Sequence, residues 1–419
     1  MQIDASTADG STAFGDNFMD PYISNNCQRV ILTRTGSRAG QPNKCVAVIQ
    51  VPEGSQSPVQ HSHRVGYTAR LTSQYQADFA RDYSIKEEKE LLPPLLLELG
   101  TLDEEFRSKM GSPLANDGER RTAIVMVANE GVVDLLLNFI CSSEAAGVKA
   151  ADIVVFVGTK EVVPLIENMG ASAIYSPALG SMPQRAAGGY LDDTFSRMMW
   201  FKTTSVYLAV RAGFNVLFQD VDLVWMKNPI PYLKAIDSDI SFMDDGARTP
   251  RYTPFFVNSG FFFVKYNQRT LYFQEKMLKS GPSEIGYTHS HQSVLIRHAA
   301  EAHHSFGMKI YLLDRELFPS GQAYHEKKNF IKKIVEHTYM PYVFHMCWTS
   351  NRVDKVKYFK EIGLWYIPDT HKSPQCTQSR HMISWAVDSI AGQKKVKKGA
   401  KILDNCCDRT KYWSYDGKH

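Results

Sequence analysis

Two carboxylates stand one residue apart in the segment NVLFQDVDLVWMKNPIPYL, which covers residues 215–233. They are Asp220 and Asp222, and the apolar run at 215–218 before them predicts a buried strand. Side chains alternate along an extended chain, so both carboxylates would point to the same side. Two like charges at close range repel unless a cation lies between them, and carboxylates suit hard cations such as Mg²⁺ and Mn²⁺. The pair predicts a divalent metal site, and an exposed aspartate-rich turn is the alternative for a bare Asp-x-Asp.

The sequence before this pair predicts the sheet that would position it. Apolar runs at 123–128, 152–158 and 171–177 predict strands, and the segments between them, 131–147 and 160–170, predict helices that end at glycines. This alternation predicts right-handed βαβ units and a mainly parallel sheet. In such sheets ligands bind at the carboxyl ends of the strands, which is where the two aspartates would lie.

A predicted helix at 192–213 leads directly into the strand that precedes the aspartates. Asp192 or Asp193 can cap its start, and Gly213 can end it. Lys202 falls on the apolar stripe of this helix. Either the lysine extends to water at the edge of the stripe, or its charge reaches a buried anionic ligand.

Composition narrows the class of protein. The 419 residues are 43% hydrophobic and 22% charged, as in a globular protein with a sizeable core, and the net charge of +4 gives no reason to expect a nucleic-acid partner. None of the seven cysteines forms a CxxC pair, so a zinc ribbon is not expected, and disulfides between Cys27 and Cys45 and between Cys376 and Cys406 or Cys407 stay open. No apolar run approaches the ~18–20 residues that span a bilayer, and the first residues do not resemble a signal peptide.

The two ends of the chain are less informative. The segments 29–36 and 45–54 are expected to pair as strands, and 84–110 predicts a helix that breaks at Pro93 and Pro94. The composition of 111–121 is that of a linker. We therefore expect an N-terminal extension or stem-like region at 1–118, a main domain at 119–370 and a C-terminal extension at 371–419.

Six ordered motifs resemble those of a known family. The segment 216–233 resembles the central signature of the nucleotide-diphosphosugar transferases of glycosyltransferase family 77, a plant and algal group of xylosyl-, arabinosyl- and galactosyltransferases. The signature is an apolar strand, Asp-x-Asp, an apolar pair with Trp, and then Pro and an aromatic residue. Five further motifs follow the family's order, and the resemblance covers about residues 121–367; these motifs are at 125–139, 190–207, 255–267, 317–326 and 343–365.

This resemblance implies a GT-A type fold, which is a Rossmann-like, mainly parallel mixed sheet flanked by helices. It also implies a UDP-sugar donor, a glycan or glycoprotein acceptor and a retaining mechanism. Asp220, Asp222 and His345 would hold Mn²⁺ or Mg²⁺, and an imidazole ligand favours Mn²⁺. The metal would neutralise the diphosphate of the donor.

The same motifs assign roles to other residues. Lys202, Arg352 and Lys355 would reach the phosphates, although a solvated helix face is the alternative for the last two. Residues at strand ends would meet the donor or acceptor: Ala128 and Asn129 the nucleoside, and Asn258 and Gly260 the donor sugar or acceptor. The group that attacks the anomeric carbon stays open among Gln219, Asp244 and Asp245. For His345 the alternative is a core histidine, and for Asn129 a turn residue.

One position departs from the family. Where relatives tend to carry Asp-Gln, this chain has His291 and Gln292, so the family's acidic residue is missing there. The change would alter the donor or acceptor preference, or only the local packing.

Two rival functions fit part of the pattern. An apolar strand followed by Asp-x-Asp also opens haloacid-dehalogenase-type phosphatases, in which the first aspartate is a nucleophile. That motif lies on the first strand of their fold, whereas several strand–helix units precede it here. The other rival is a non-catalytic sugar- or nucleotide-binding protein on the same scaffold. The family resemblance places the protein in the Golgi lumen, although this chain shows no membrane tether.

Overall fold

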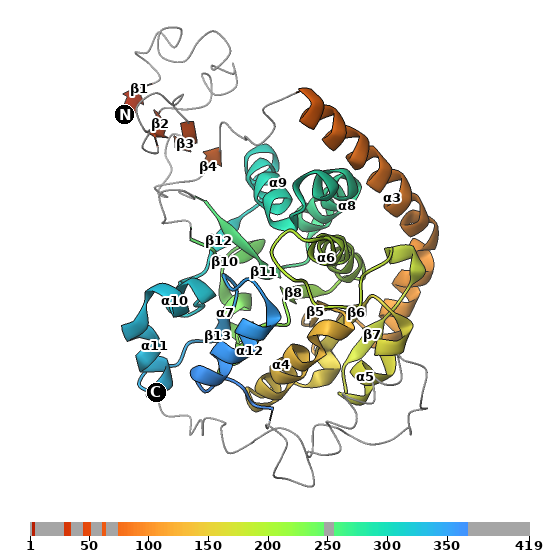
Figure 1. Ribbon diagram of the computed structural model, residues 1–419. Helices are drawn as coiled ribbons and strands as arrows, with labels where there is room; N and C mark the ends of the chain where they lie inside the picture. Colours follow the sequence, from red (N-terminus) through yellow and green to blue (C-terminus); the bar gives the residue numbers. More distant parts are fainter. Residues whose placement is uncertain are drawn as a thin grey trace.

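The computed structural model describes residues 74–246 and 255–367 and four short strands nearer the N-terminus. These four strands pair in chain order into an antiparallel sheet (Figure 1); they are β1 (Gln2–Asp4), β2 (Arg29–Arg34), β3 (Cys45–Val51) and β4 (His61–His63). The pairing of β2 with β3 confirms the hairpin expected from the sequence. The expected C-terminal extension at 371–419 lies outside the described residues, as do both cysteine pairings.

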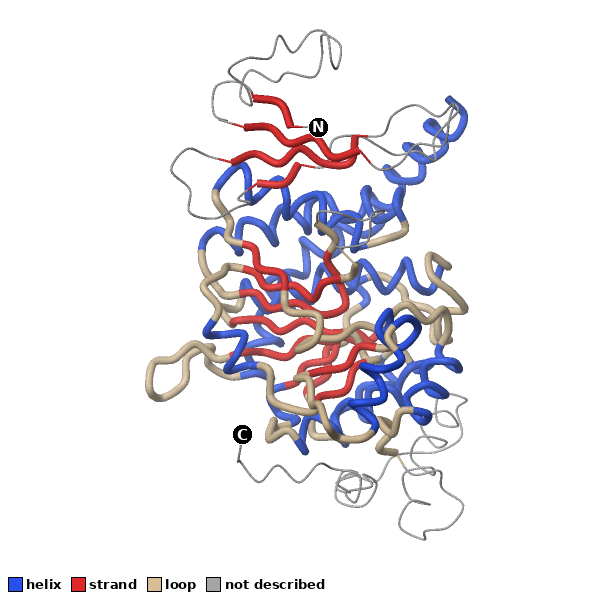
Figure 2. The backbone as a smooth tube through the Cα atoms, turned by 90° about the vertical axis from the view of Figure 1, so that its left-hand side faces the viewer, coloured by secondary structure: helices blue, strands red, loops and turns tan. Residues whose placement is uncertain are grey.

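A seven-stranded mixed sheet runs through the middle of the main domain (Figure 2), in the order β12-β10-β11-β8-β5-β6-β7. Only β11 runs against the other six strands. The expected α/β architecture with a mainly parallel sheet is therefore confirmed. The strands are β5 (Thr122–Ala128), β6 (Ile153–Val157), β7 (Ser172–Ile174), β8 (Asn215–Gln219), β10 (Ile240–Asp244), β11 (Val257–Val264) and β12 (Ile310–Leu312).

Helices cover both faces of this sheet, because its strands are apolar on both sides. In β5, Met126 points into one core and its neighbours Val125 and Val127 into the other, as the two-residue repeat of a strand requires. One core includes α3 (Gln74–Met110), α6 (Asp193–Arg211), α8 (Gln268–Thr288) and α9 (His291–Phe306). The other includes α4 (Val133–Ala145), α5 (Val163–Asn168), α7 (Ile230–Ala235), α10 (Gly321–Glu326), α11 (Lys328–Val335) and α12 (Arg352–Glu361).

A second, two-stranded sheet belongs to the same core as α4. In it β9 (Leu223–Trp225) pairs antiparallel with β13 (Val343–His345). Four 3₁₀ helices complete the described elements; they are η1 (Glu130–Val132), η2 (Ala150–Asp152), η3 (Lys160–Val162) and η4 (Pro177–Leu179). Among the described residues, no helix has both the length and the apolar character that crossing a membrane requires.

Helix α3 passes through Pro93 and Pro94 without a break, so the break expected there is wrong. A proline inside a helix costs about 3 kcal/mol, because it removes a hydrogen bond and crowds the preceding turn. Here apolar side chains before and after the prolines, among them Leu91, Leu95 and Phe106, are buried in the core that α6 and α8 also form. Part of the segment expected to be an extension is therefore core.

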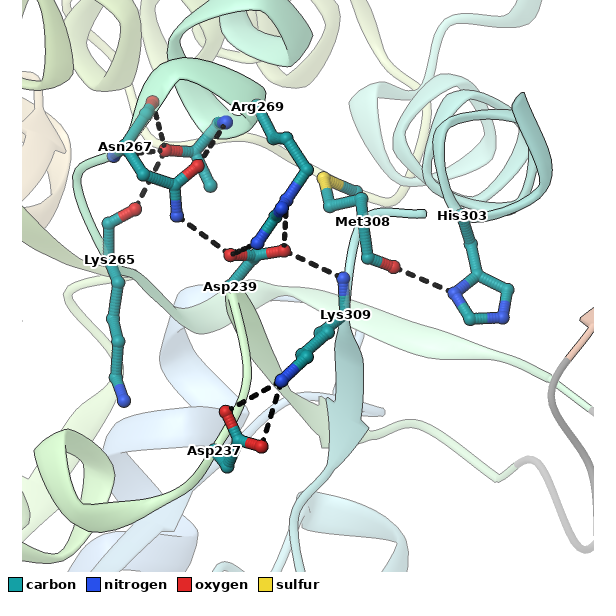
Figure 3. A network of polar contacts seen from close by, with 9 residues as sticks. Asp237, Asp239, Lys265, Asn267, Arg269, His303, Met308 and Lys309 are labelled. Atoms are coloured by element: carbon teal, nitrogen blue, oxygen red, sulfur yellow. Dashed lines mark hydrogen bonds and ion pairs between the residues drawn. The ribbon is translucent and has the colours of Figure 1, made fainter. Parts of the chain in front are cut away.

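A buried carboxylate, Asp239, lies just before the first residue of β10 and anchors the start of this strand (Figure 3). Asp239 accepts hydrogen bonds from Asn267 Nδ2 at 2.7 Å, from Arg269 Nε at 2.9 Å and from the Lys309 backbone N–H at 2.8 Å. Burial raises the pKa of Asp239, but these hydrogen bonds outweigh it and hold the pKa below its ordinary value. The network joins the starts of β10, α8 and β12.

Candidate active site

A cavity of 430 Å³ lies where the strands of the sheet end. Its lining includes Val127 at the end of β5, Asp220 just after β8 and Asp245 just after β10. These strands run in the same direction, so the cavity is at their carboxyl ends, as expected for an α/β sheet. Its volume lies in the usual range for small-molecule sites, roughly 300–1,000 Å³.

Asp220, Asp222 and His345 meet in this cavity. Each offers one ligand atom, and these atoms all lie within 4.8 Å of one another. The pairing of β9 with β13 sets His345 opposite Leu223, which brings the imidazole beside Asp222, and the His345 Nε2–Asp222 Oδ1 distance is 3.3 Å. The structure thus brings together the three predicted ligands from two distant parts of the chain.

The chemistry of this cluster suits a divalent metal. His345 is 1% exposed, yet neither ring nitrogen has a hydrogen-bond partner of good geometry. Buried polar atoms without partners are costly, so each such atom calls for an explanation, and a metal ion that accepts a ring nitrogen as ligand would supply one. Two carboxylates and one imidazole are a donor set that Mn²⁺ accepts readily.

Gly260 on β11 makes room for the cluster. A Cβ at this position would collide with the Asp220 carboxylate and would lie 2.6 Å from His345 Cε1. The Gly260 carbonyl also accepts a hydrogen bond of 2.8 Å from the Asp220 backbone N–H. The glycine is therefore needed for the close approach of the Asp220 and His345 side chains.

Two lysines neutralise the carboxylates. Lys202 Nζ lies 2.5 Å from Asp220 Oδ1, and Lys355 Nζ lies 2.7 Å from Asp222 Oδ2. Burial raises the pKa of Asp222, but the charges of Lys355 and His345 outweigh it and hold the pKa well below its ordinary value. The Lys202 side chain is only 6% exposed, so it reaches the partly buried Asp220 carboxylate and does not extend to water. Its helix α6 starts at the expected cap, where Asp192 Oδ1 accepts from the Phe195 N–H at 2.7 Å.

Asp245 is the centre of a second polar cluster in the same cavity. Its Oδ1 accepts from Asn258 Nδ2 and from Trp348 Nε1, each at 2.9 Å, and its Oδ2 accepts from Gln292 Nε2 at 2.9 Å. Burial raises the pKa of Asp245 above its ordinary value in spite of these three hydrogen bonds. Asn258 and Gln292 thus occupy fixed positions on the cavity wall.

Four expected site residues do not line the cavity in the described part of the chain. Gln219 is fully buried, and its Oε1 accepts from Trp225 Nε1 at 2.9 Å. Ala128 is buried at the end of β5, and Asp244 is bonded to the Gly246 N–H at 2.7 Å. Asn129 donates to the carbonyls of Pro183 and Arg185 at 2.7 and 2.8 Å, so it holds the loop from which Ala186 and Ala187 line the cavity.

Arg352 and Lys355 begin α12 as predicted, but they point to different partners. Both line the cavity, whereas the Arg352 guanidinium forms an ion pair with Asp134 in the first turn of α4. Arg352 therefore ties α12 to α4, and Lys355 is the residue that reaches Asp222.

His291 and Gln292, where the sequence departs from the family's Asp-Gln, lie in two different environments. His291 is buried, and burial together with the charge of Lys202 on α6 lowers its pKa to about 3. Gln292 lies in the cavity and is bonded to Asp245. The residue that replaces the family's acid is therefore a neutral histidine that packs against Phe262, with a ring-centroid distance of 6.4 Å.

Sequence reasoning gave no role to Trp348, although it lies in the motif at 343–365. Its indole lines the cavity and is bonded to Asp245. The only local signal was an aromatic residue three positions after His345, which by itself indicates nothing.

Comparison with known proteins agrees with this geometry. Residues 165–359 match the family model described as nucleotide-diphospho-sugar transferase. Among curated relatives, the β-arabinofuranosyltransferase RAY1 of Arabidopsis thaliana is 26% identical over 267 residues, which is 60% of this chain and 49% of that protein. A UDP-galactose:fucoside α-3-galactosyltransferase of Dictyostelium discoideum is 28% identical over 201 residues, which is 44% of this chain and 30% of that protein. The chain thus spans half or less of the length of these relatives.

Similar solved structures include further glycosyltransferases. GlyE of Streptococcus pneumoniae TIGR4 matches with a TM-score of 0.36 at 13% identity, covering 58% of this chain and 60% of that one. Mouse xyloside xylosyltransferase 1 matches with a TM-score of 0.33 at 11% identity, covering 55% of this chain and 99% of that one. The family match and the curated relatives support a nucleotide-diphospho-sugar glycosyltransferase.

Proposed function

We propose that this protein transfers a sugar from a UDP-sugar to a hydroxyl of a glycan or glycoprotein, with the help of a divalent metal and with retention of configuration. The observation that carries the proposal is the cluster of Asp220, Asp222 and His345 in a cavity that also contains two lysines. A cation site beside fixed positive charges is suited to a diphosphate.

The side chains in and around this cluster would have different roles. Asp220, Asp222 and His345 would hold Mn²⁺ or Mg²⁺, which when bound neutralises the leaving diphosphate. Lys202 and Lys355 would add positive charge at the same place, and the burial of Lys202 makes its charge act through a low dielectric. Arg352 would act indirectly, because its ion pair with Asp134 holds α12 in place.

In the reaction, the bond between the anomeric carbon and the β-phosphate oxygen breaks, and a bond from that carbon to the acceptor oxygen forms. The acceptor proton goes to the leaving diphosphate. Among the described residues that line the cavity, the carboxylates are Asp220, Asp222 and Asp245. The first two belong to the metal cluster and the third already accepts three hydrogen bonds, so none is placed as the base that an inverting mechanism needs. This favours retention.

The donor would lie across the cavity, with its nucleoside near the ends of β5 and η1. The apolar wall there includes Val127, Val132 and Leu135, and the loop held by Asn129 closes it. A direct contact of the nucleoside with Ala128 or Asn129 stays a prediction. Asn258 and Gln292, which also line the cavity, would contact the donor sugar.

The choice of UDP and of a glycan acceptor rests on relatives. One is named for UDP-galactose and a fucoside, and the other for the transfer of arabinofuranose. A Golgi lumen location is proposed from the family that the chain resembles. A phosphatase is disfavoured because β8, which leads into the aspartates, is a central strand that follows β5, β6 and β7 in the chain.

The test is the release of UDP from a panel of UDP-sugars with and without Mn²⁺, together with UDP-induced thermal stabilisation. We expect Mn²⁺-dependent release with at least one donor, and its loss in Asp222→Ala. The matched control is Asp237→Ala, because the Asp237 side chain is 88% exposed and lies outside the cavity. Stabilisation by UDP that is equal with and without metal would refute the metal site, and hydrolysis of a simple phosphomonoester in Mg²⁺ would support the phosphatase.

A further inference from the structure

Trp348 presents a large aromatic surface at the rim of the cavity. It is 42% exposed, while the metal ligands Asp222 and His345 are buried deeper in the same cavity. Exposed tryptophans at cavities are common binding surfaces, because the ring offers a wide apolar area at little cost in side-chain entropy.

The backbone of Trp348 is held in a costly conformation. Its φ of 60° lies in the left-handed region, which costs a non-glycine residue about 1–3 kcal/mol. Such a conformation persists only where the surroundings fix it. Gly321 makes room for this turn, because a Cβ there would collide with the carbonyl of Cys347, the residue just before Trp348.

The indole itself is held by Asp245. Its Nε1 donates to Asp245 Oδ1 at 2.9 Å, and the same carboxylate binds Asn258 and Gln292. The carboxylate is buried, so this hydrogen bond is shielded from water and fixes the direction of the ring. The polar cluster and the aromatic ring therefore form one unit.

The order of groups along the cavity separates two sugar positions. The donor sugar is linked to the diphosphate, so it must lie beside the metal cluster, against Asn258 and Gln292. The acceptor approaches from solvent and must lie at the rim, where Trp348, Thr349 and Ser350 line the cavity. A sugar ring has one apolar face of C–H groups and hydroxyls at its edge, which matches an exposed indole with hydroxyl side chains beside it.

We propose that Trp348 is the stacking platform for the terminal sugar ring of the acceptor, and that Asp245 is the residue that positions it. The proposal rests on the proposed function, because it needs a donor sugar at the metal cluster. It identifies the acceptor as a sugar, not as a bare peptide hydroxyl.

The test compares UDP release alone with UDP release stimulated by methyl glycosides of galactose, fucose, xylose and arabinofuranose. In Trp348→Ala we expect the KM for the stimulating glycoside to rise at least tenfold, and by a clearly larger factor than the KM for the donor. Trp348→Phe keeps a ring and should recover most of the loss. Tyr272→Ala is the control, because Tyr272 is 57% exposed and lies outside the cavity.

A second measurement tests the positioning role of Asp245. If Asp245 acts on the acceptor by holding the indole, the rise in acceptor KM in the double variant Asp245→Ala/Trp348→Ala will be no larger than in Trp348→Ala. This role would be refuted if the rise in acceptor KM in the double variant equalled the product of the rises in the two single variants.

The outcomes separate the two proposals. If the native protein releases no UDP with any donor, the proposed function fails. If it releases UDP but no methyl glycoside stimulates it, or only a serine- and proline-rich peptide does, the platform is refuted while the transferase stands. An equal loss of stimulated and unstimulated release in Trp348→Ala would also refute it.

Discussion

Lys202 Nζ lies 2.5 Å from Asp220 Oδ1, although the two residues come from different elements, α6 and the turn after β8. The lysine is on the apolar stripe of a helix packed over the sheet, and its ammonium group forms an ion pair with one carboxylate in the cavity. A cation in this position both offsets the repulsion between two aspartates and faces any phosphate that binds beside them.

The first prediction follows from this contact. Lys202→Met should lower kcat/KM for the UDP-sugar about 100-fold, because one buried positive charge at a developing diphosphate is worth about 2.7 kcal/mol. Steady-state kinetics at saturating Mn²⁺ measure this. The control is Lys234→Met, which removes a partly exposed lysine that is paired with Glu119 outside the cavity. Equal small losses in both variants would show that the Lys202 charge does not act on the donor.

The second prediction concerns the space that Gly260 leaves. Gly260→Ala should weaken Mn²⁺ binding at least 100-fold, because the added Cβ overlaps the Asp220 carboxylate and crowds His345. Titration calorimetry with Mn²⁺ measures this. Gly189→Ala is the matched control, since Gly189 lines the same cavity and a Cβ there meets no atom within 4 Å. Native-like affinity in Gly260→Ala would mean that Asp220 is not a ligand in this position.

The third prediction is a pH dependence that involves Asp239. Its pKa is lowered on folding, so its contribution to stability is present above the ordinary value near 3.8 and is lost as the pH falls through the lower folded value. Asp239→Asn should cost about 2 kcal/mol at pH 7, because the hydrogen bonds from Arg269 lose their charge. Urea unfolding at pH 7, 5, 4 and 3 should show the difference between the two proteins shrinking below pH 4. Asp237→Asn, with an exposed carboxylate, should show neither effect.

The fourth prediction concerns His291. Burial and Lys202 lower its pKa to about 3, whereas in the unfolded chain it stays near the ordinary 6.5. Between these values the unfolded state binds the extra proton, so His291 makes the fold less stable as the pH falls below 6.5. The loss from pH 7 to pH 5 is about 2 kcal/mol, since each unit of pKa difference is worth about 1.4 kcal/mol. His291→Asn should lose less stability over this range than the native protein, and His325→Asn, which changes an exposed histidine, should lose as much.

The sequence predicted the elements that follow local patterns. The apolar runs became β5, β6 and β8, the cap at Asp192 began α6, and the Asp-x-Asp pair came to lie at the end of a strand as expected. These features depend on neighbours in the chain. The position of His345 was predicted only through the order of motifs in a family, because its pairing with β9 is a contact between distant segments.

Two expectations differ from the structure for physical reasons. Gln219 was one of three open candidates for the attacking group, but along β8 its side chain lies on the same face as Leu217, in the core away from α6, and there it accepts a hydrogen bond from Trp225. Because successive side chains of a strand point to opposite faces, Gln219 must face away from its neighbour Asp220, and this could have been predicted from the sequence. The break at Pro93 was expected because prolines disfavour helices, but burial on both sides of the prolines overrides a local preference, and no local pattern reports that burial.

The role of Asp245 was beyond sequence reasoning for a different reason. Its three partners, Asn258, Gln292 and Trp348, come from β11, α9 and the loop after β13. Any one of them can be noticed alone, but only their convergence on one carboxylate gives them a joint role.

The pairing of β13 with β9 determines when, during folding, the three side chains of the cluster come together. During synthesis the two aspartates leave the ribosome long before His345, and the imidazole can reach them only after β13 has joined its partner strand. An ion that binds through all three side chains would therefore be held only after β13 has paired with β9. Metal binding would then report that these two distant segments have come together.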